Sequence, residues 1–497
     1  MKILFIQSKA GFQMRGTTYP VCRSMMVTAT YMKSLGHEVE IFDKCIDFRK
    51  NEKVLNSFKP EIVMMYVPPT AELKDTEETS KAAKRFGATV VWAEVLACVF
   101  SEQIVEKGLA DFVIIGETEA KFEALIRELR GEKNFISIPG LTFNNGEKVI
   151  TTANENNSDL ENLPPIDWDL VDVKKCFREF PHCRRMLYMY TSRGCPNRCG
   201  FCFNTFFYNS QHRKRPLKYF LEEVKYLEKK YRLDGVNFSD EVLLLTEEEI
   251  EQMGQFRKEN GLKFFWGGQT RADAYADEET LKKMYDAGCR WLLLGLETGS
   301  AKTRNLINKQ MNQDMIREFV DKCTRAGLTT FGSFIAGFPD ETEEDLKETV
   351  KFALSLNLDA FLVNYYGVIL KTPLADKLIA DGKMDISAVM DAEGLAHWYP
   401  NLFKNYSKIP DRELKVVKSY FDWLTFTRKK AESEQKNMFI RKAIDVLANF
   451  TRGDLKSAFG NVYSAGKTFV TVVFYSHAFP KIRKKYGLHN INKKDKI

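Results

Sequence analysis

Three cysteines stand close together near the middle of the chain. Cys195, Cys199 and Cys202 have the spacing C-x3-C-x2-C, and the next cysteine along the chain is Cys289. Three thiolates can bind three irons of a cubane cluster, which leaves the fourth iron open to a small molecule. A ferredoxin-type site would need a fourth cysteine at a short step, and structural zinc a fourth ligand, for which only His212 is near. The spacing favours an open iron–sulfur cluster over zinc or structural cysteines.

The run from Ser192 to Cys202, with the aromatic Phe201 before its last cysteine, resembles the cluster-binding motif of the radical SAM superfamily. The resemblance implies that the three cysteines bind a 4Fe-4S cluster whose open iron chelates S-adenosylmethionine. It also implies that one electron from an external donor, a flavodoxin or a ferredoxin, cleaves S-adenosylmethionine to a 5'-deoxyadenosyl radical. The order of the motifs on both sides of this run is similar to that of the cobalamin-binding subgroup.

The whole chain has 497 residues, of which 44% are hydrophobic and 12% aromatic, enough for two to four globular domains. No run has the length of a membrane span, and the apolar start Met1–Ile6 meets polar residues at once, unlike a secretory signal. The ten cysteines have no regular spacing outside the central motif and do not make a disulfide framework. We expect a cytoplasmic protein in reducing, anaerobic surroundings.

Residues 1–135 alternate strand and helix patterns. Five short apolar, β-branched runs predict strands at Lys2–Gln7, Glu38–Phe42, Glu61–Tyr66, Thr89–Trp92 and Phe112–Ile115. Helix-period segments such as Pro20–Leu35 and Ser101–Gly108 separate them. This alternation predicts an α/β domain with a doubly wound, flavodoxin-like parallel sheet that binds ligands beyond the carboxyl ends of its strands. No G-x-G-x-x-G follows the first strand, which counts against a dinucleotide site.

The segment Ile114–Glu119 is similar to the Gly-Glu-x-Glu segment of the subgroup's cobalamin-binding domain. The resemblance implies a corrinoid at the mouth of the sheet. Its expected contacts are Ser8, Arg15, Thr17, Val67, Pro68, Glu94, Val95, Gly116 and Glu117. No Asp-x-His-x-x-Gly is present to coordinate cobalt, and Trp92–Val95 replaces the usual Gly-Gly-x-His, where bulk would alter or close the pocket. A domain with this fold and no cofactor is the alternative.

A second family, the methylthiotransferases, also begins with a doubly wound domain, and uses three of its cysteines for another cluster. Cys22, Cys45 and Cys98 match that number. However, Cys22 lies on the predicted first helix, and the C-terminal part is expected to be helical where that family has a small β domain. Buried cysteines behave as small apolar residues, which suits all three better.

Residues 136–182 carry turn signals and are expected to be a linker, and residues 183–385 return to alternating strands and helices. The predicted strands are Met186–Tyr190, Gly235–Phe238, Phe264–Trp266, Trp291–Leu294, Thr329–Ile335 and Ala360–Val363. Six such strands fit a partial (β/α)6 TIM barrel, the radical SAM core, whose chemistry would lie at the carboxyl ends of the strands.

Polar residues and glycines follow these strands. They are Ser239, Asp240, Glu241, Arg271, Glu297 and Gly337. Glycine lets backbone approach an adenosine, a carboxylate can accept hydrogen bonds from ribose hydroxyls or an ammonium, and arginine can bind a carboxylate bidentately. Each alone could be ordinary turn or capping chemistry, but their order resembles the strand-end motifs of the subgroup, so we expect them, with Phe201, to bind S-adenosylmethionine. Tyr365 and Tyr366 end the last strand, where we expect both to face the mouth and contact substrate.

Residues 386–497 are expected to form a mainly helical domain, with helix-period runs at Arg412–Phe426 and Phe439–Asn449. Residues 428–497 hold 16 Lys and Arg against 5 Asp and Glu, so this tail has a net charge of +11 within a chain of +7. The apolar Thr468–Tyr475 and the basic Lys481–Lys485 could make a peripheral membrane contact, although packing on the barrel and a solvated helical face are the alternatives. Thr372–Leu374 is similar to the family's Pro-Gly-Thr-Pro-Leu, with Leu370 and Lys371 in place of Pro-Gly.

The function implied by these resemblances is a cobalamin-dependent radical SAM methyltransferase that acts on an unactivated carbon or phosphorus. A cyclase or rearrangement enzyme of the same subgroup, without methyl transfer, is one alternative. A corrinoid- or cluster-sensing protein without turnover is the other, and the full set of strand-end residues argues against it. The substrate, whether a small molecule, lipid, tetrapyrrole or peptide, is not determined by the sequence, and nucleic acid is not expected.

Overall fold

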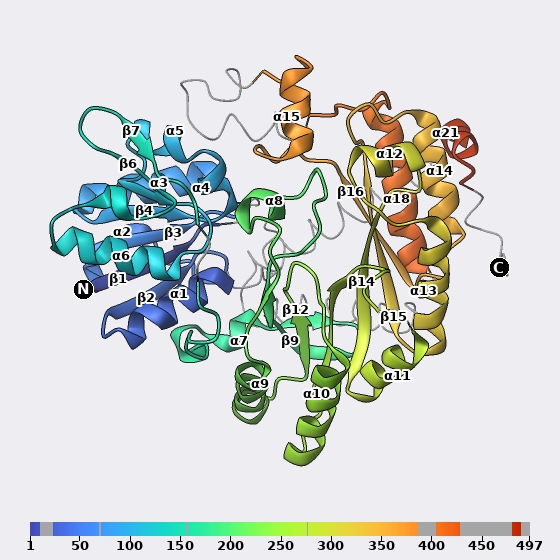
Figure 1. Ribbon diagram of the computed structural model, residues 1–497, viewed down its shortest axis with the longest axis horizontal. Helices are drawn as coiled ribbons and strands as arrows, with labels where there is room; N and C mark the ends of the chain where they lie inside the picture. The colour runs from blue at the N-terminus through green and yellow to red at the C-terminus, as the bar shows by residue number, and fades with distance from the viewer. Residues whose placement is uncertain are drawn as a thin grey trace, which may run out of the picture.

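The computed structural model describes residues 1–9, 23–68, 71–155, 158–275, 277–385, 404–427 and 480–488. Its two seven-stranded sheets lie side by side, and the chain passes from the first to the second through a segment that carries short helices (Figure 1). Within these residues no helix is both long and apolar enough to cross a membrane.

The first sheet has the strand order β2-β1-β3-β4-β5-β6-β7. Its parallel strands are β1 (Lys2–Gln7), β2 (Glu38–Asp43), β3 (Ile62–Tyr66), β4 (Thr89–Ala93) and β5 (Phe112–Ile114). The order 2-1-3-4-5 is that of a flavodoxin-like doubly wound sheet, so the predicted fold is confirmed.

Helices bury both faces of this sheet, which is why its strands read as continuous apolar runs. Ile3 and Phe5 of β1 lie in one buried cluster, and Leu4 and Ile6 lie in another. The helices of this part are α1 (Arg23–Ser34), α2 (Asn51–Phe58), α3 (Leu73–Phe86), α4 (Val95–Val99), α5 (Ser101–Glu106) and α6 (Glu119–Arg130). The first cluster contains residues of α1 and α6, and the second contains residues of α2, α3 and α5.

A hairpin extends the first sheet beyond its parallel part. Strands β6 (Leu141–Asn144) and β7 (Val149–Thr151) are antiparallel, and β6 pairs with β5. Both lie inside residues 136–182, which the sequence analysis predicted to be a linker. The two strands were missed because they are short and the turn residues between them dominate the pattern. The rest of that segment holds short elements, η1 (Phe135–Ser137), η2 (Trp168–Leu170), α7 (Val173–Cys176) and β8 (Arg178–Phe180).

The second sheet has the order β16-β15-β14-β13-β12-β9-β8. Six strands are parallel, namely β9 (Cys183–Met189), β12 (Gly235–Phe238), β13 (Phe265–Thr270), β14 (Cys289–Glu297), β15 (Thr329–Ala336) and β16 (Ala360–Tyr365). Strand β8 joins β9 in antiparallel orientation. The six parallel strands of a partial barrel are therefore confirmed.

Helices follow the strands of this barrel, and all of those named here except α9 begin at a side-chain cap. They are α9 (Leu217–Tyr231), α10 (Glu247–Asn260), α11 (Glu278–Asp286), α12 (Ala301–Leu306), α13 (Gln313–Arg325), α14 (Glu343–Leu354) and α15 (Pro373–Ala380). Thr246 and Thr342 form capping boxes at α10 and α14, which fix where the strand-end loops stop. Three aromatic rings pack inside the half-barrel, with the Phe180 ring centroid 4.9 Å from that of Trp291 and 5.4 Å from that of Phe331.

The C-terminal part packs against the last strand of the barrel. Helix α18 (Asp411–Thr427) coincides with the predicted helix Arg412–Phe426, and Thr425 exchanges two hydrogen bonds with the backbone of Phe361 in β16, at 2.8 and 3.0 Å. Helix α21 (Pro480–Lys485) lies against α18, where Lys485 is 3.0 Å from Glu413. Part of the basic segment is thus paired within the protein. The predicted helix Phe439–Asn449 and the apolar Thr468–Tyr475 lie outside the described residues.

Candidate functional site

The three cysteines lie on one loop between β10 (Ser192–Arg193) and α8 (Asn204–Phe207). The buried Asn204 side chain accepts from the backbone N–H of Cys195 at 2.8 Å and donates to the carbonyl of Cys195 at 2.7 Å. Gly200 donates to the Ile307 carbonyl at 2.8 Å and accepts from the Leu374 N–H at 2.9 Å. The loop is therefore held from α8, from the end of α12 and from α15.

The thiols of this loop fit a cluster that is bound by three ligands. Burial raises the pKa of Cys199, and it raises that of Cys202 to about 12, with the charges of the neighbouring cysteines adding to the effect. The positive charge of Lys309 lowers the pKa of both thiols. Cys199 and Cys202 are thus neutral without metal, and iron, which binds thiolates, would deprotonate them in a pocket that already holds a cation.

The residues after β12 bind the backbone that directly precedes Cys195. Asp240 accepts from the backbone N–H groups of Thr191, at 2.9 Å, and Ser192. Burial raises the pKa of the Asp240 carboxyl to about 6. Glu241 accepts from the Gly194 N–H at 2.7 Å, and Ser239 donates its own N–H to the Met189 carbonyl at 2.7 Å. Their predicted role with S-adenosylmethionine stays a prediction.

The other strand-end residues lie around the cysteines. Arg271 makes two hydrogen bonds to Asp273, at 2.7 and 2.6 Å, and its charge acts on Cys199. Glu297 has a positive φ of 61° and pairs with the buried Lys309 at 3.0 Å. Lys309 lies in the turn after α12 and was missed by the sequence analysis, because a lone lysine in a polar turn carries no signal.

Aromatic and glycine positions complete this side of the barrel. The Phe201 ring contacts the Phe338 ring edge-on, with centroids 5.7 Å apart. Gly337, at φ +84°, donates its N–H to the Glu341 carboxylate at 2.6 Å. The structure separates the two tyrosines, since Tyr365 is 40% exposed and Tyr366 is buried with its ring centroid 5.3 Å from Phe338. Their roles as substrate contacts stay predictions.

The mouth of the first sheet carries the predicted corrinoid contacts. The buried hydroxyl of Ser8 has no hydrogen-bond partner among the described residues, which fits a ligand atom at the end of β1. Glu94 has φ 82° and ψ 174°, a backbone conformation that is nearly restricted to glycine, and accepts from the Ser24 hydroxyl. Val67 is buried and Pro68 is half-buried. Arg15 and Thr17 lie outside the described residues.

Some residues at the carboxyl end of the first sheet pack directly against the barrel domain. Val95 lies in one apolar cluster with Cys98 and Ile115 of the first domain and with Phe207 and Tyr208, which belong to α8 and the residue after it. Lys371, with φ 65°, donates to the Cys98 carbonyl at 2.7 Å. Gly116 donates its N–H to the Cys98 sulfur at 3.4 Å. Of the bulky residues expected at the end of β4, Val95 thus makes interdomain contacts, whereas the Trp92 indole donates to the Ser80 hydroxyl of the same domain at 3.1 Å.

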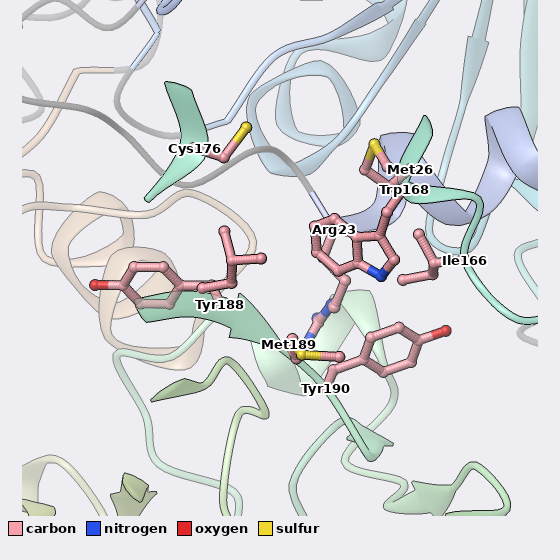
Figure 2. Close-up of a pocket in the computed structure, with 9 residues that line it drawn as sticks. Arg23, Met26, Ile166, Trp168, Cys176, Tyr188, Met189 and Tyr190 are labelled. Carbon is pink, nitrogen blue, oxygen red and sulfur yellow. The ribbon is translucent and has the colours of Figure 1, made fainter. Parts of the chain in front are cut away.

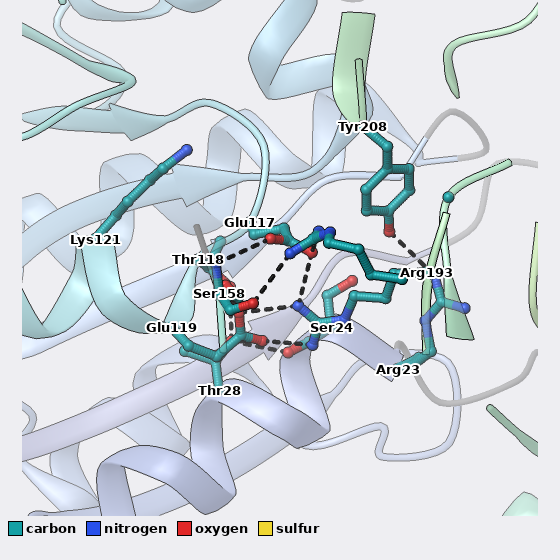
Figure 3. Close-up of polar contacts among 12 residues, drawn as sticks. Arg23, Ser24, Thr28, Glu117, Thr118, Glu119, Lys121, Ser158, Arg193 and Tyr208 are labelled. Carbon is teal, nitrogen blue, oxygen red and sulfur yellow. Dashed lines mark hydrogen bonds and ion pairs between the residues drawn. The ribbon is translucent and has the colours of Figure 1, made fainter. Parts of the chain in front are cut away.

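Glu117 makes contacts that the sequence analysis did not foresee. Its carboxylate pairs with Arg193 of the cluster loop at 3.2 Å and with Arg213, and accepts from the Ser158 N–H at 3.3 Å (Figure 3). The segment with Glu117 and Glu119 therefore faces the half-barrel directly. Its predicted corrinoid contact stays a prediction.

A cavity of about 20 Å³ lies between α1 and β9, lined by Arg23, Ile166, Trp168 and Tyr188 among others (Figure 2). This volume is enough for about one water molecule, not for a substrate. The Trp168 indole N–H is buried there without a partner among the described residues. We regard the cavity as a small packing space behind the site.

The cysteines weighed for a second cluster behave as buried apolar residues where the structure describes them. The Cys45 thiol is 3.8 Å from the Ser8 carbonyl, and the Cys98 thiol is 3.7 Å from the Ile114 carbonyl. Burial raises the pKa of Cys98 to about 12. Cys22 lies outside the described residues.

Residues 189–353 match the Radical SAM superfamily. The chain is 27% identical over 333 residues to an uncharacterized methyltransferase of Pyrococcus horikoshii, covering 65% of this chain and 71% of that protein. It is 26% identical to the anaerobic magnesium-protoporphyrin IX monomethyl ester cyclase of Cereibacter sphaeroides, covering 76% of this chain and 64% of that protein. The structure of the radical S-adenosylmethionine methyltransferase TsrM from Kitasatospora setae, with cobalamin and a 4Fe-4S cluster bound, matches with a TM-score of 0.64 at 15% identity, covering 76% of this chain and 75% of TsrM. This likeness shows a shared fold.

Proposed function

Residues 189–353 of this chain form a radical SAM domain, and from this we propose that the protein is a cobalamin-dependent radical SAM methyltransferase. The observation that carries the proposal is the apposition of two sites. The loop with Cys195, Cys199 and Cys202 lies against the carboxyl end of a doubly wound sheet, which is where such sheets bind ligands. The methyltransferases among the similar proteins support the same function.

When bound, the 4Fe-4S cluster with S-adenosylmethionine supplies a radical that abstracts hydrogen, and cobalamin supplies the methyl group. The three cysteines hold the cluster, and Phe201 packs beside it. Arg271 and Lys309 put positive charge next to the thiolates, and Arg271, whose Nε and Nη2 bind Asp273, would offer its remaining N–H groups to the methionyl carboxylate. Ser8 binds the corrinoid at the end of β1. The protein's task is to hold the two cofactors face to face and to keep water out.

The substrate takes a methyl group at an unactivated carbon or phosphorus and is a small molecule, lipid, tetrapyrrole or peptide. An external flavodoxin or ferredoxin supplies electrons. The cyclase of Cereibacter sphaeroides keeps a second function open, in which the same parts act on a tetrapyrrole without methyl transfer. The two functions differ in one product, because only methyl transfer makes S-adenosylhomocysteine.

The test is anaerobic turnover of the reconstituted full-length chain with added corrinoid, a reductant and methyl-labelled S-adenosylmethionine. We expect both 5'-deoxyadenosine and S-adenosylhomocysteine, the second only when corrinoid is present. Deoxyadenosine alone would contradict methyl transfer and favour the cyclase function. An intact cluster with no cleavage of S-adenosylmethionine would favour a sensor.

Cys195→Ala is the variant that ties this chemistry to the loop. We expect it to lose the cluster and both products, because two thiolates cannot hold a cubane in place of three. The matched control is Cys323→Ala, which removes a buried thiol from α13. We expect the control to keep wild-type iron content; equal iron loss in both variants would mean that the cysteine loop is not the cluster site.

A further inference from the structure

Three arginines cross between the sheets near the cluster loop, Arg193 and Arg213 from the barrel and Arg23 from the first domain. Arg193 belongs to the radical SAM domain and directly precedes Gly194 and Cys195. Its guanidinium, 4% exposed, makes a bidentate pair with Glu119, at 2.8 and 3.1 Å, and a third contact with Glu117 (Figure 3). Both glutamates follow β5 of the first sheet. Arg193, two residues before the first cluster cysteine, is thus bound to the other domain.

Arg23 reaches the opposite way, from the start of α1 into the loop after β12. Its guanidinium donates to Glu241 at 2.6 Å, to the Ser239 carbonyl at 2.7 Å and to the Tyr208 hydroxyl at 3.1 Å. The second oxygen of Glu241 accepts from the Gly194 N–H at 2.7 Å. Arg193 and Arg23 therefore both hold the peptide that joins Arg193 to Gly194. Arg193 does so through its own side chain, and Arg23 does so through Glu241, which accepts from the Gly194 N–H.

Gly194 connects these contacts to the cluster loop, because it lies between Arg193 and Cys195. It has φ +78°, and a Cβ atom on it would lie 1.9 Å from the Gln211 carbonyl oxygen, so no other residue fits without displacement. The Gly194 N–H is bonded to Glu241, and the N–H and carbonyl of Cys195 are both bonded to the buried Asn204 side chain. A shift of Glu241 or Arg193 with the first domain therefore acts on backbone that is tied directly to Cys195.

The ring of Tyr190 lies among the guanidinium groups. Arg23 is 5.3 Å, Arg193 5.7 Å and Arg215 5.0 Å from its centroid. Four arginines and four glutamates make the ion pairs of this region, so their charges balance; they are Arg23, Arg193, Arg213, Arg215, Glu117, Glu119, Glu223 and Glu241. Buried ion pairs of this kind add little stability relative to apolar packing, but they can specify one arrangement over others.

We propose that Arg193 and Arg23 are positioning residues that fix the cluster loop against the mouth of the first sheet. They thereby set the separation between S-adenosylmethionine at the cluster and the methyl donor in the first domain, a consequence that rests on the proposed function. Neither residue needs to touch a cofactor. A displacement of about 1 Å between reacting groups can lower a rate by two orders of magnitude. Loss of these contacts is therefore expected to slow methyl transfer between the two domains.

Arg193→Lys is the test, because lysine keeps the charge but lacks the planar fork that binds Glu119 bidentately. Its matched control is Arg215→Lys. Arg215 is as buried, contacts the same Tyr190 ring and pairs with Glu223, but that pair lies eight residues apart within the radical SAM domain. Both variants disturb a buried pair, and only one of these pairs crosses between the domains.

Two half-reactions are followed without substrate, in the full chain with its cluster and added reduced corrinoid. 5'-Deoxyadenosine formed without substrate measures the reductive cleavage of S-adenosylmethionine at the cluster. Corrinoid-dependent S-adenosylhomocysteine measures methyl transfer from S-adenosylmethionine to the corrinoid, which is the step between the domains. We expect Arg193→Lys to keep deoxyadenosine within about twofold and to lower S-adenosylhomocysteine about tenfold or more, whereas Arg215→Lys leaves their ratio unchanged. An unchanged ratio in Arg193→Lys would overturn the proposal.

A distance measurement separates this proposal from the proposed function. A nitroxide on Phe48→Cys, at a side chain that is 79% exposed in the first domain, reports its separation from the reduced cluster by pulsed electron paramagnetic resonance, with the labelled parent chain as background control. We expect one narrow distribution in Phe48→Cys alone and in Phe48→Cys combined with Arg215→Lys, and a shifted or broadened one in Phe48→Cys combined with Arg193→Lys. If no corrinoid yields S-adenosylhomocysteine, methyl transfer fails, while an unchanged distance distribution contradicts the positioning role. Glu119→Gln removes the same pair from the other side and serves where Arg193→Lys does not fold.

Discussion

Glu94 is the clearest case of backbone strain at a predicted site residue. Its φ of 82° and ψ of 174° place a side chain where glycine is the usual residue, at the end of β4. Burial raises the pKa of its carboxyl, so the folded state also carries a partly desolvated acid there. Strain of this kind collects at functional sites, which agrees with the place of Glu94 at the mouth of the first sheet.

Glu94→Gly tests this strain. We expect the glycine variant to be more stable than the parent by about 1 kcal/mol, because relief of the backbone exceeds the loss of the Ser24 hydrogen bond. Glu94→Ala, which keeps the unfavourable φ, is the control and should gain less. Denaturant midpoints of the cluster-free proteins give the comparison, and a glycine variant below the parent would refute the expectation.

Glu341 predicts a pH dependence of stability. It is 1% exposed, one of its oxygens accepts from the Gly337 and Phe338 N–H groups, and burial raises its pKa from 4.5 to about 7. The folded state therefore binds the proton more tightly than the unfolded state. The contribution is fully present below about pH 4.5 and is lost as the pH rises to about 7, by about 3 kcal/mol at most.

Glu341→Gln should remove that dependence. We expect the difference in unfolding free energy between variant and parent to move in favour of the variant as the pH rises from 5 to 8, since glutamine never ionises. The difference between the two proteins is the quantity to measure, because Asp240, with a pKa of about 6, contributes equally to both. A difference that stays flat with pH would show that Glu341 is not protonated in the folded protein.

Among the elements, β13 and β14 depend on a glycine. A Cβ atom on Gly267 would lie 2.2 Å from the Trp291 carbonyl oxygen and 2.4 Å from its ring. Trp291 also donates its indole N–H to Asn237 at 2.9 Å, so the ring cannot move away freely. The strands of the half-barrel can approach each other at this level only because position 267 has no side chain.

Gly267→Ala is therefore expected to destabilise the protein by about 3 kcal/mol, measured as a shift of the denaturation midpoint. Gly254→Ala is the control. That glycine lies inside α10, and an added methyl would contact Ala287 at an ordinary 3.5 Å, so we expect a gain of about 0.5–1 kcal/mol from helix propensity. Similar effects of the two substitutions would mean that β13 and β14 are not packed as described.

In the molecule as a whole, the buried clusters do not stop at the domain boundary. The cluster that contains Ile3 and Phe5 of β1 continues to Leu187 of β9 and Phe238 of β12. The second cluster joins Trp92 of β4 to residues of the barrel loops. Together with the arginine contacts, this continuous apolar packing argues against domains that move independently.

We therefore expect both sheets to unfold in one transition. Hydrogen exchange across a denaturant series should show peptides of β1–β5 and of β12–β16 losing protection at the same midpoint, because their cores are continuous. Two well-separated midpoints would contradict this expectation and would indicate domains of independent stability. Peptides of β8 serve as an internal reference for the edge of the second sheet.

The sequence by itself determined the two parallel sheets and the cysteine loop. Strands buried on both faces leave continuous apolar runs, so their ends were placed within a few residues, and cluster ligands on one loop need only local spacing. Tertiary structure alone decided the ion-pair partners of Glu117, Glu241, Arg23 and Arg193, which lie 74 to 218 residues apart in the chain. Charged side chains carry no periodic signal, and whether one binds a cofactor or another residue depends on which distant segment packs beside it.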